Sequence, residues 1–476
     1  MHNLINTSYS NQYLLRKKSY TLLLVFILFL IYSAWINIEA VSCVDLAYVT
    51  FTCYVFICMM IIYLVFNGDL FHPILQYIFF SLISDAVVPA FIIISNYDNS
   101  GFYQSSKLVL FEASVYKIIA LLSLYCGYKS QLTLDLTKAF PGFNRTFYRN
   151  RVLVFIVLCL SASVLSISYI IYQRGGIISY LIGLSNRIVL FMNYAYITEI
   201  IKLSQLSLYI YYIYFYIKNK KTLRNAIAIT LIMLITVIAN LLTGSRGELI
   251  KVIITLIFIY NYYVRRIKFR DLLLPIMFCL LIFTVLGNIR EQLSGMVLYG
   301  EKAELNESLI KHVMASAEGF TTFSKLTASV PGKTGYYYGK TYMESPLSLI
   351  PRALYPDKPV GASWELNKII ADNEFIYSTD INVPLSGSGA DLIHESYLNF
   401  GVIGIVVAFF IQGVLYSAYY RLIIDSSMNN YKMLLCTYVY SLISIGESFG
   451  YIIKILVTIT PLLLFYYFAK KHIIIK

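Results

Sequence analysis

The chain has 476 residues, of which 58% are hydrophobic and 16% aromatic, while only 13% are charged. Soluble globular proteins carry about 25% charged residues, so this composition, with a mean hydropathy of +0.69, excludes a soluble enzyme, a disordered chain and a disulfide scaffold. The net charge of +13 does not indicate a nucleic-acid partner, because the basic residues gather at the ends of apolar segments.

Apolar segments long enough to cross a bilayer, about 20 residues each, recur along the chain. They predict an all-α polytopic membrane protein with about twelve transmembrane helices. The predicted spans are 20–37, 43–66, 74–97, 108–128, 152–172, 197–217, 226–243, 248–264, 271–288, 396–418, 432–449 and 451–468. The first span follows Arg16-Lys17-Lys18 without a small-residue cleavage site, so we expect a retained signal anchor.

The distribution of lysine and arginine predicts the orientation of these spans. With the N-terminus in the cytoplasm, twenty-one of these residues fall in cytoplasmic segments and four in the short outward loops. An excess of basic residues in short cytoplasmic loops is the positive-inside rule. We therefore expect a multi-pass protein with both termini in the cytoplasm.

One long polar segment divides the chain into three parts. Residues 1–288 form an N-terminal membrane domain of about nine spans, 289–395 a large outward loop, and 396–476 a C-terminal membrane domain of about three spans. The loop contains six prolines, a predicted helix over 303–329 and a proline-rich portion, 346–359, that should be irregular. Loops of this length are either functional or disordered, and the aromatic residues and mixed charge here favour a functional loop.

Cysteine and histidine residues give no metal-binding pattern. All seven cysteines fall inside apolar runs, no Cys-X-X-Cys pair exists, and the five histidines are scattered. The cysteines are therefore interpreted as small buried hydrophobic residues. We expect neither a metal site nor a cofactor.

Arginines occur in four outward segments near the outer membrane surface. The segments are 173–176 with Arg187 beyond it, 243–248, 288–290 and 350–359. A guanidinium group pairs with phosphate oxygens in bidentate fashion and does not deprotonate; the alternative is that each arginine anchors the chain at the interface. Glycine- and proline-shaped turns favour phosphate binding at Arg246 and Arg352, whereas Arg187 and Arg290 leave both interpretations open.

A histidine with acidic neighbours stands where the long loop re-enters the membrane. His394 has Asp391 before it and Glu395 beside it. An imidazole titrates near neutral pH and is a suitable general base, although a lone histidine is also often structural. All three side chains remain candidates for the base.

Ionisable residues within the spans are costly and need partners. Glu199 with Lys202, and Glu248 with Lys251, are spaced i, i+3 and are expected to neutralise each other on one helix face. Glu112 and Lys117 are five residues apart and need other partners. Four further residues have no local partner: Asp45, Asp85, Glu447 and Lys454. We expect salt bridges between spans to account for most of these six.

Several of these segments together resemble a known family. The sequences TGSRGELI (243–250), IPRALYPDKP (350–359) and HESYLNFGVIG (394–404), with RGGI (174–177) upstream, resemble the O-antigen polymerase (Wzy-type) family. The HESYLNFG segment is also similar to the histidine-containing stretch of O-antigen ligases. The resemblance covers about residues 20–465.

This resemblance implies a metal-independent glycosyltransferase of the multi-span GT-C type, at the periplasmic face of the bacterial inner membrane. It would join undecaprenyl-pyrophosphate-linked oligosaccharide repeat units into polysaccharide, surrounded by membrane lipid and with a chain-length regulator as a further partner. The pyrophosphate-binding arginines would be Arg174, Arg187, Arg246 and Arg352. The ligase-like base would be His394, with Glu395 standing where ligases commonly carry Asn.

Aromatic residues of the long loop offer flat faces for sugar rings. Besides the loop tyrosines in general, the expected sugar contacts are Tyr355, Lys358 and Trp364.

Two other functions compete with polymerisation. An O-antigen ligase would transfer the same donor to a lipid A core. A lipid-linked oligosaccharide flippase or transporter should show paired halves and short outer loops, and this chain has one long outward loop instead.

Overall fold

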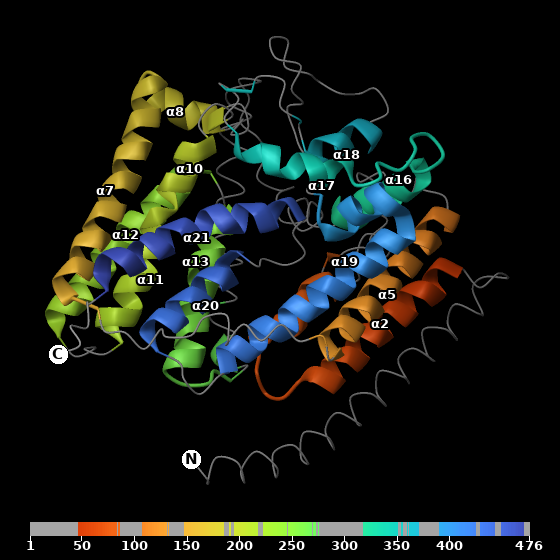
Figure 1. The fold of residues 1–476 in the computed structure, drawn as a ribbon, viewed down its shortest axis with the longest axis horizontal. Coiled ribbons are helices and arrows are strands. Elements are labelled where there is room, and N and C mark those ends of the chain that lie inside the picture. Colours follow the sequence, from red (N-terminus) through yellow and green to blue (C-terminus); the bar gives the residue numbers. More distant parts are fainter. Residues whose placement is uncertain are drawn as a thin grey trace, which may run out of the picture.

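The computed structural model describes residues 46–82, 84–85, 107–130, 132, 147–184, 190–191, 195–217, 222–244, 246–268, 270–272, 275, 318–350, 354–355, 359, 361–370, 390–424, 429–442 and 449–470. Throughout these residues the regular structure is helical, with no β-strand, as the sequence predicts (Figure 1). The predicted span 20–37 and almost all of the span 271–288 lie outside the described residues.

The first helical group contains the helices around α19. Its members are α2 (Leu46–Val65), α3 (Pro73–Leu82), α5 (Lys107–Lys129) and α19 (Leu392–Ile424). The long loop contributes α16 (Glu318–Ser329), α17 (Lys340–Glu344), the 3₁₀ helix η6 (Ser345–Leu349) and α18 (Ala362–Ile370). Helices α16 and α17 contact α19, α18 contacts α16, and η6 contacts α21 (Phe449–Ala469) (Figure 1). The loop is thus structured in its described part, and residues 346–349 of the portion expected to be irregular belong to the short helix η6.

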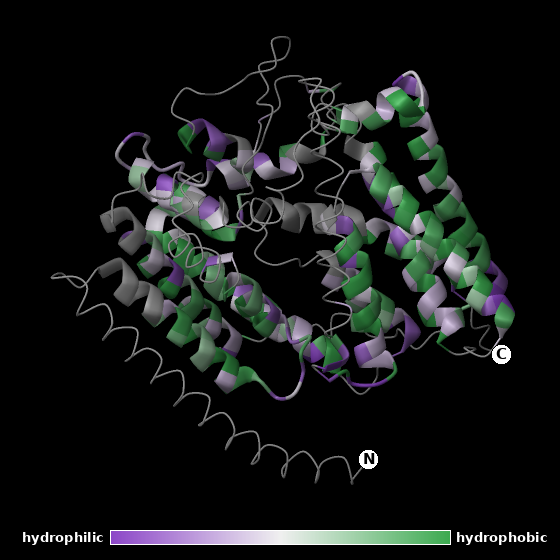
Figure 2. Cartoon of the chain, turned by 180° about the vertical axis from the view of Figure 1, so that it is seen from behind, coloured by the Kyte–Doolittle hydropathy of each residue, from purple (hydrophilic) through white to green (hydrophobic). Residues whose placement is uncertain are grey.

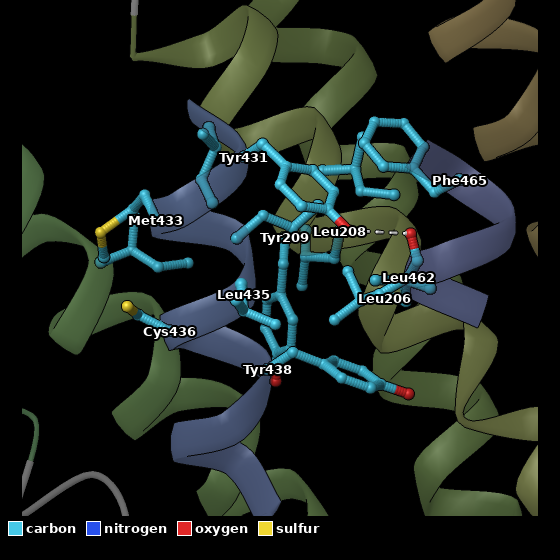
Figure 3. Packing of buried hydrophobic residues seen from close by; sticks show 14 of the residues in the cluster. Leu206, Leu208, Tyr209, Tyr431, Met433, Leu435, Cys436, Tyr438, Leu462 and Phe465 are labelled. Atoms are coloured by element: carbon cyan, nitrogen blue, oxygen red, sulfur yellow. Dashed lines mark hydrogen bonds between the residues drawn. The ribbon is translucent and has the colours of Figure 1, made fainter. Parts of the chain in front are cut away.

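The second helical group contains the remaining helices. They are α7 (Arg149–Gln173), α8 (Ile177–Gly183), α10 (Ala195–Ile201), α11 (Leu203–Tyr211), the π-helix η4 (Tyr212–Tyr216), α12 (Leu223–Leu242), α13 (Arg246–Tyr263), α20 (Asn430–Leu442) and α21 (Phe449–Ala469). Large side chains of α11, α20 and α21 form its centre (Figure 3). The Tyr431 hydroxyl donates a hydrogen bond to the Leu462 carbonyl at 3.3 Å and so links α20 to α21.

Three of the described helices are long and apolar enough to cross a membrane: α7, α12 and α19. The outward face of α12 shows why such a helix suits lipid. Its exposed apolar side chains recur every three or four residues, at Leu223, Ile227, Leu231, Leu234 and Ile238. This spacing forms one apolar stripe, and hydrophobic residues predominate along the long helices (Figure 2).

Glycines bring α5 and α19 into close contact. A Cβ atom on Gly127 would lie 2.0 Å from the Phe410 carbonyl oxygen, and one on Gly413 would lie 2.1 Å from the Leu124 carbonyl oxygen. Only glycine permits such an approach of two backbones, which is a common way for helices to associate in membranes.

The helix α19 is broken, whereas the sequence predicts one continuous span over 396–418. Phe400 (φ −138°, ψ 15°) and Gly401 (φ 61°, ψ −141°) leave the helical conformation. The break separates a first arm, residues 392–399, from a second arm, residues 402–424. The left-handed φ of Gly401 requires glycine, and the Tyr336 hydroxyl would lie 2.9 Å from a Cβ atom there.

Candidate active site

The first arm of α19 begins at Asp391, whose carboxylate caps the helix. Its Oδ1 accepts hydrogen bonds from the backbone N–H groups of Ile393 and His394, both at 3.2 Å. Aspartate is among the best residues for this position, because it satisfies N–H groups that have no partner within the helix. The cap also places the negative charge at the positive end of the helix.

The same carboxylate holds the ring of His394. The His394 Nδ1 lies 2.5 Å from the Asp391 Oδ1, and the Nε2 lies 3.0 Å from the Thr322 hydroxyl of α16. The histidine is 1% exposed, whereas the Asp391 side chain is 42% exposed. The edge of the Phe323 ring covers the imidazole, with ring centroids 5.4 Å apart.

The hydrogen bonds around His394 allow two protonation states. The Thr322 hydroxyl is within reach of both the Nε2 and the Gly319 carbonyl, the latter at 3.1 Å. When the ring is neutral and its Nδ1–H faces Asp391, the Thr322 hydroxyl can donate to Nε2. When the ring is protonated, Nε2–H can donate to Thr322, which then donates to Gly319. The ring can therefore gain or lose a proton at Nε2 without leaving a buried polar atom unpaired.

The charge state of Asp391 suits this arrangement. Desolvation by itself would raise the pKa of the carboxyl. The charge and the hydrogen bond of His394, together with the charge of Lys117, lower the pKa by more than desolvation raises it. The net effect holds the pKa of Asp391 below its ordinary value, so the side chain is a carboxylate at neutral pH.

Glu395 lies in a separate buried network that ties the loop to the first arm. Its Oε1 accepts a hydrogen bond from the Thr341 hydroxyl at 3.0 Å. The Asn399 side-chain amide donates to the Thr341 oxygen at 2.6 Å and to the Glu395 carbonyl at 2.8 Å. Its oxygen accepts from the Gly339 N–H at 3.0 Å. Glu395 is 2% exposed.

A buried ion pair lies behind this centre. The Lys117 ammonium of α5 is 2.5 Å from the Asp85 Oδ1, which confirms the prediction that these residues find partners on other helices. The ammonium also faces the Phe320 and Phe323 rings at 5.5 and 5.7 Å. Phe323 therefore separates a fixed cation from the His394 ring.

The helix after Arg174 is bonded to the end of the helix that precedes Arg246. Arg174 is the C-cap of α7, and its Nη2 donates to the Leu190 carbonyl at 2.7 Å. The Tyr180 hydroxyl of α8 donates to the carbonyl of Leu242, the last residue of α12. Thr243 and Gly244 follow in a turn, and α13 begins at Arg246.

The structure describes only some of the other predicted site residues. Arg187, Arg352, Lys358 and the side chains of Arg246 and Trp364 lie outside what the structure describes, and Tyr355 is half-buried after η6. Arg174 and His394 belong to different helical groups (Figure 1). The joint site of four arginines and a histidine therefore stays a prediction.

Polar residues inside the second helical group form the two predicted ion pairs and a hydrogen-bonded group around Gln205. The pairs are Glu199–Lys202 at 2.8 Å and Glu248–Lys251 at 3.6 Å. Gln205, which no sequence pattern marks as a partner, donates to Asn240 at 2.7 Å and to Glu248 at 3.2 Å. Among the described residues, no group of three or more His, Cys, Asp and Glu side chains is arranged to hold a metal ion.

Comparison with known proteins gives one match. The family model described as O-antigen polysaccharide polymerase Wzy matches residues 20–476, nearly the whole chain. No curated protein and no solved structure matches it.

Proposed function

The chain belongs to the O-antigen polysaccharide polymerase Wzy family, and from this premise we propose that it joins undecaprenyl-pyrophosphate-linked oligosaccharide repeat units into polysaccharide. The reaction takes place at the periplasmic face of the bacterial inner membrane and needs no metal ion. The protein crosses that membrane about twelve times, with both termini in the cytoplasm and residues 289–395 in the periplasm.

The pairing of His394 with Asp391 carries this proposal. A hydroxyl group of the acceptor sugar attacks the anomeric carbon of the donor sugar, and the bond from that carbon to the pyrophosphate oxygen breaks. His394 takes the hydroxyl proton at Nε2, and undecaprenyl pyrophosphate leaves. General base catalysis of this kind contributes roughly 10²–10⁴-fold in rate.

The roles of the three acidic or basic neighbours follow from their environments. Asp391 is a weak base because its pKa is lowered, so it stabilises the protonated His394 rather than taking the proton itself. Glu395 is held by Thr341 and is buried, which favours a role in positioning the first arm. The Thr322 hydroxyl must turn from Nε2 toward Gly319, its other partner, before a sugar hydroxyl can reach the ring.

The leaving pyrophosphate needs positive charge because no metal ion neutralises it. We assign this task to Arg174, Arg187, Arg246 and Arg352. The Tyr180–Leu242 hydrogen bond, which ties the helix after Arg174 to the end of the helix before Arg246, supports the assignment for these two arginines. Each well-placed donor of this kind stabilises a transition state by about 3–4 kcal/mol. Tyr355, Lys358 and Trp364 contact the sugars, and a chain-length regulator is a further partner.

The test is incubation of the purified protein with lipid-linked repeat units, followed by separation of the products. The proposal predicts a ladder of polymers from the wild type, and no ladder from Arg246→Ala or Arg352→Ala although both insert into the membrane. Arg224→Ala is a matched control, because Arg224 is exposed at the opposite end of α12.

Other outcomes would identify the competing functions. Transfer of single units or chains to a lipid A core, without a ladder, would indicate a ligase. Movement of substrate across vesicles without extension would indicate a flippase. In cells, deletion of a polymerase leaves lipopolysaccharide capped with one repeat unit, whereas deletion of a ligase leaves the core uncapped.

A further inference from the structure

Tyr338 has a backbone conformation that tyrosine rarely adopts. Its φ is +48°, and it is the one residue other than glycine with a positive φ in the part of the chain that the structure describes. For a bulky L-residue this left-handed conformation is strained, because the Cβ atom crowds the following carbonyl oxygen. Such strain persists only where the surroundings enforce it, and it gathers at functional sites.

Three successive backbone hydrogen bonds enforce the conformation. The N–H of Tyr337 donates to the Leu398 carbonyl, the N–H of Tyr338 to the Asn399 carbonyl, and the N–H of Gly339 to the Asn399 side-chain oxygen, each at 3.0 Å. These carbonyls lie at the end of the first arm of α19, where the helix breaks. The segment 337–339 thus closes the open end of the arm that carries His394.

The neighbours of Tyr338 pack against the protein, but its own ring does not. The Tyr336 hydroxyl lies at Gly401 in the helix break, and the Tyr337 hydroxyl donates to Glu365 of α18 at 3.1 Å. Tyr338 is 76% exposed and meets only the edge of the Tyr336 ring, at a centroid distance of 6.4 Å, among the ring contacts described. The strained backbone therefore presents an aromatic face to the outside.

The chemistry around this ring suits a sugar better than a bilayer. Lys340 and Glu344 follow on α17 with their charged groups 3.9 Å apart, and the Lys340 side chain is 60% exposed. Lys340 also faces the Tyr337 ring. Charged side chains two and six residues after Tyr338 disfavour insertion of this segment into acyl chains, whereas a pyranose has both polar hydroxyls and an apolar C–H face that stacks on aromatic rings.

We propose that Tyr338 is a carbohydrate-binding residue that stacks on a sugar ring of the lipid-linked oligosaccharide beside the His394 centre. The inference rests on the proposed function for the identity of the sugar. The first arm links Tyr338 to the His394 centre: the Tyr338 N–H is bonded to the carbonyl of Asn399, the last residue of the arm, and His394 lies on the same arm. Binding at this position holds the oligosaccharide at the end of the first arm.

Four substitutions separate the ring from the backbone. Tyr338→Gly removes the ring and relieves the strain, and Tyr338→Asn removes the ring but tolerates the left-handed conformation. Tyr338→Phe and Tyr338→Trp keep a flat aromatic face. The control is Met343→Ala, because Met343 is 80% exposed in the same loop and has no part in the three hydrogen bonds.

The measurements are thermal unfolding in detergent, the KM for lipid-linked repeat units in the extension assay, and saturation-transfer NMR with the lipid-free oligosaccharide. We expect Tyr338→Gly to unfold at a higher temperature than the wild type, with a KM at least tenfold higher and no saturation transfer. Tyr338→Asn should lose binding equally, while Tyr338→Phe, Tyr338→Trp and Met343→Ala bind as the wild type does.

Three results would overturn the inference. A wild-type KM in Tyr338→Gly means that the ring does not bind sugar, and a lower unfolding temperature means that the ring serves the fold. Quenching of Tyr338→Trp fluorescence by brominated lipids means that the ring enters the bilayer. A wild-type protein that binds oligosaccharide through Tyr338 but makes no ladder would refute the proposed polymerase and leave this inference standing.

Discussion

Replacing Asp391 separates its two roles, the cap of α19 and the partner of His394. Asparagine caps helices about as well as aspartate, so Asp391→Asn keeps the hydrogen bonds to the Ile393 and His394 N–H groups and removes the charge. Alanine removes both. The two variants therefore share one loss, that of the carboxylate beside the His394 Nδ1 at 2.5 Å.

The expected sizes of these losses differ. A hydrogen bond to a charged group contributes about 1.5–3 kcal/mol to stability, and the lower value applies here because the carboxylate is 42% exposed and screened by solvent. Loss of the cap costs about 1 kcal/mol more. We expect Asp391→Asn to be destabilised by about 1.5 kcal/mol and Asp391→Ala by about 2.5 kcal/mol.

Activity should not follow stability in this pair. Without the carboxylate, the protonated imidazole loses its counter-charge and the ring can adopt the wrong tautomer, which in serine proteases lowers kcat about 10⁴-fold. Both variants should therefore extend chains at least about 100-fold more slowly. Denaturant unfolding in detergent and the rate of ladder formation measure the two quantities. If Asp391→Asn extends chains at the wild-type rate, the role of the pair is refuted. If Asp391→Ala is then much slower than Asp391→Asn, the cap matters instead of the charge.

Three further predictions follow from other contacts. Gly401→Ala should destabilise the protein by about 2 kcal/mol, because alanine resists the left-handed φ and its Cβ would lie 2.9 Å from the Tyr336 hydroxyl; Gly335→Ala, with open space around it, should leave the unfolding temperature unchanged. Lys117→Met should cost about 3–5 kcal/mol by leaving Asp85 buried without its cation, and adding Asp85→Asn should recover part of the lost unfolding temperature; no recovery would contradict the pairing. The wild type should lose stability as the pH falls below about 3.9, since the pKa of Asp391 is lower in the folded protein and protonation favours the unfolded chain, whereas Asp391→Asn should lose less over the same range in thermal unfolding.

Local patterns in the sequence predicted features that depend on nearby residues. Apolar length predicted the helical membrane character, and the i, i+3 spacing predicted the Glu248–Lys251 pair. The position of His394 beside acidic residues identified the part of the chain where the candidate base lies. These features depend on helix geometry, because the helical repeat determines which positions in the sequence are neighbours on one face.

Features that depend on distant residues were not predictable in the same way. Thr322 lies 72 residues from His394 in the sequence, and Thr341 lies 54 residues from Glu395, so no local pattern marks either as a partner. The break in α19 was also missed, because glycines are frequent in membrane helices and the sequence does not show that, of the glycines within α19, Gly401 is the one that takes a positive φ. The backbone strain at Tyr338 depends on the hydrogen bonds between residues 337–339 and the end of the first arm of α19, which are also distant in the sequence.

The hydrogen bonds between residues 337–339 and the end of the first arm make two distant stretches of sequence one module for protein engineering. A chimera that exchanges the long polar loop between relatives, but keeps the native residues 390–404, would combine a foreign segment 337–339 with a native arm. Exchange of both stretches together keeps the donors and acceptors of these hydrogen bonds matched. Grafts designed to alter which sugars are polymerised should therefore carry both stretches as a pair.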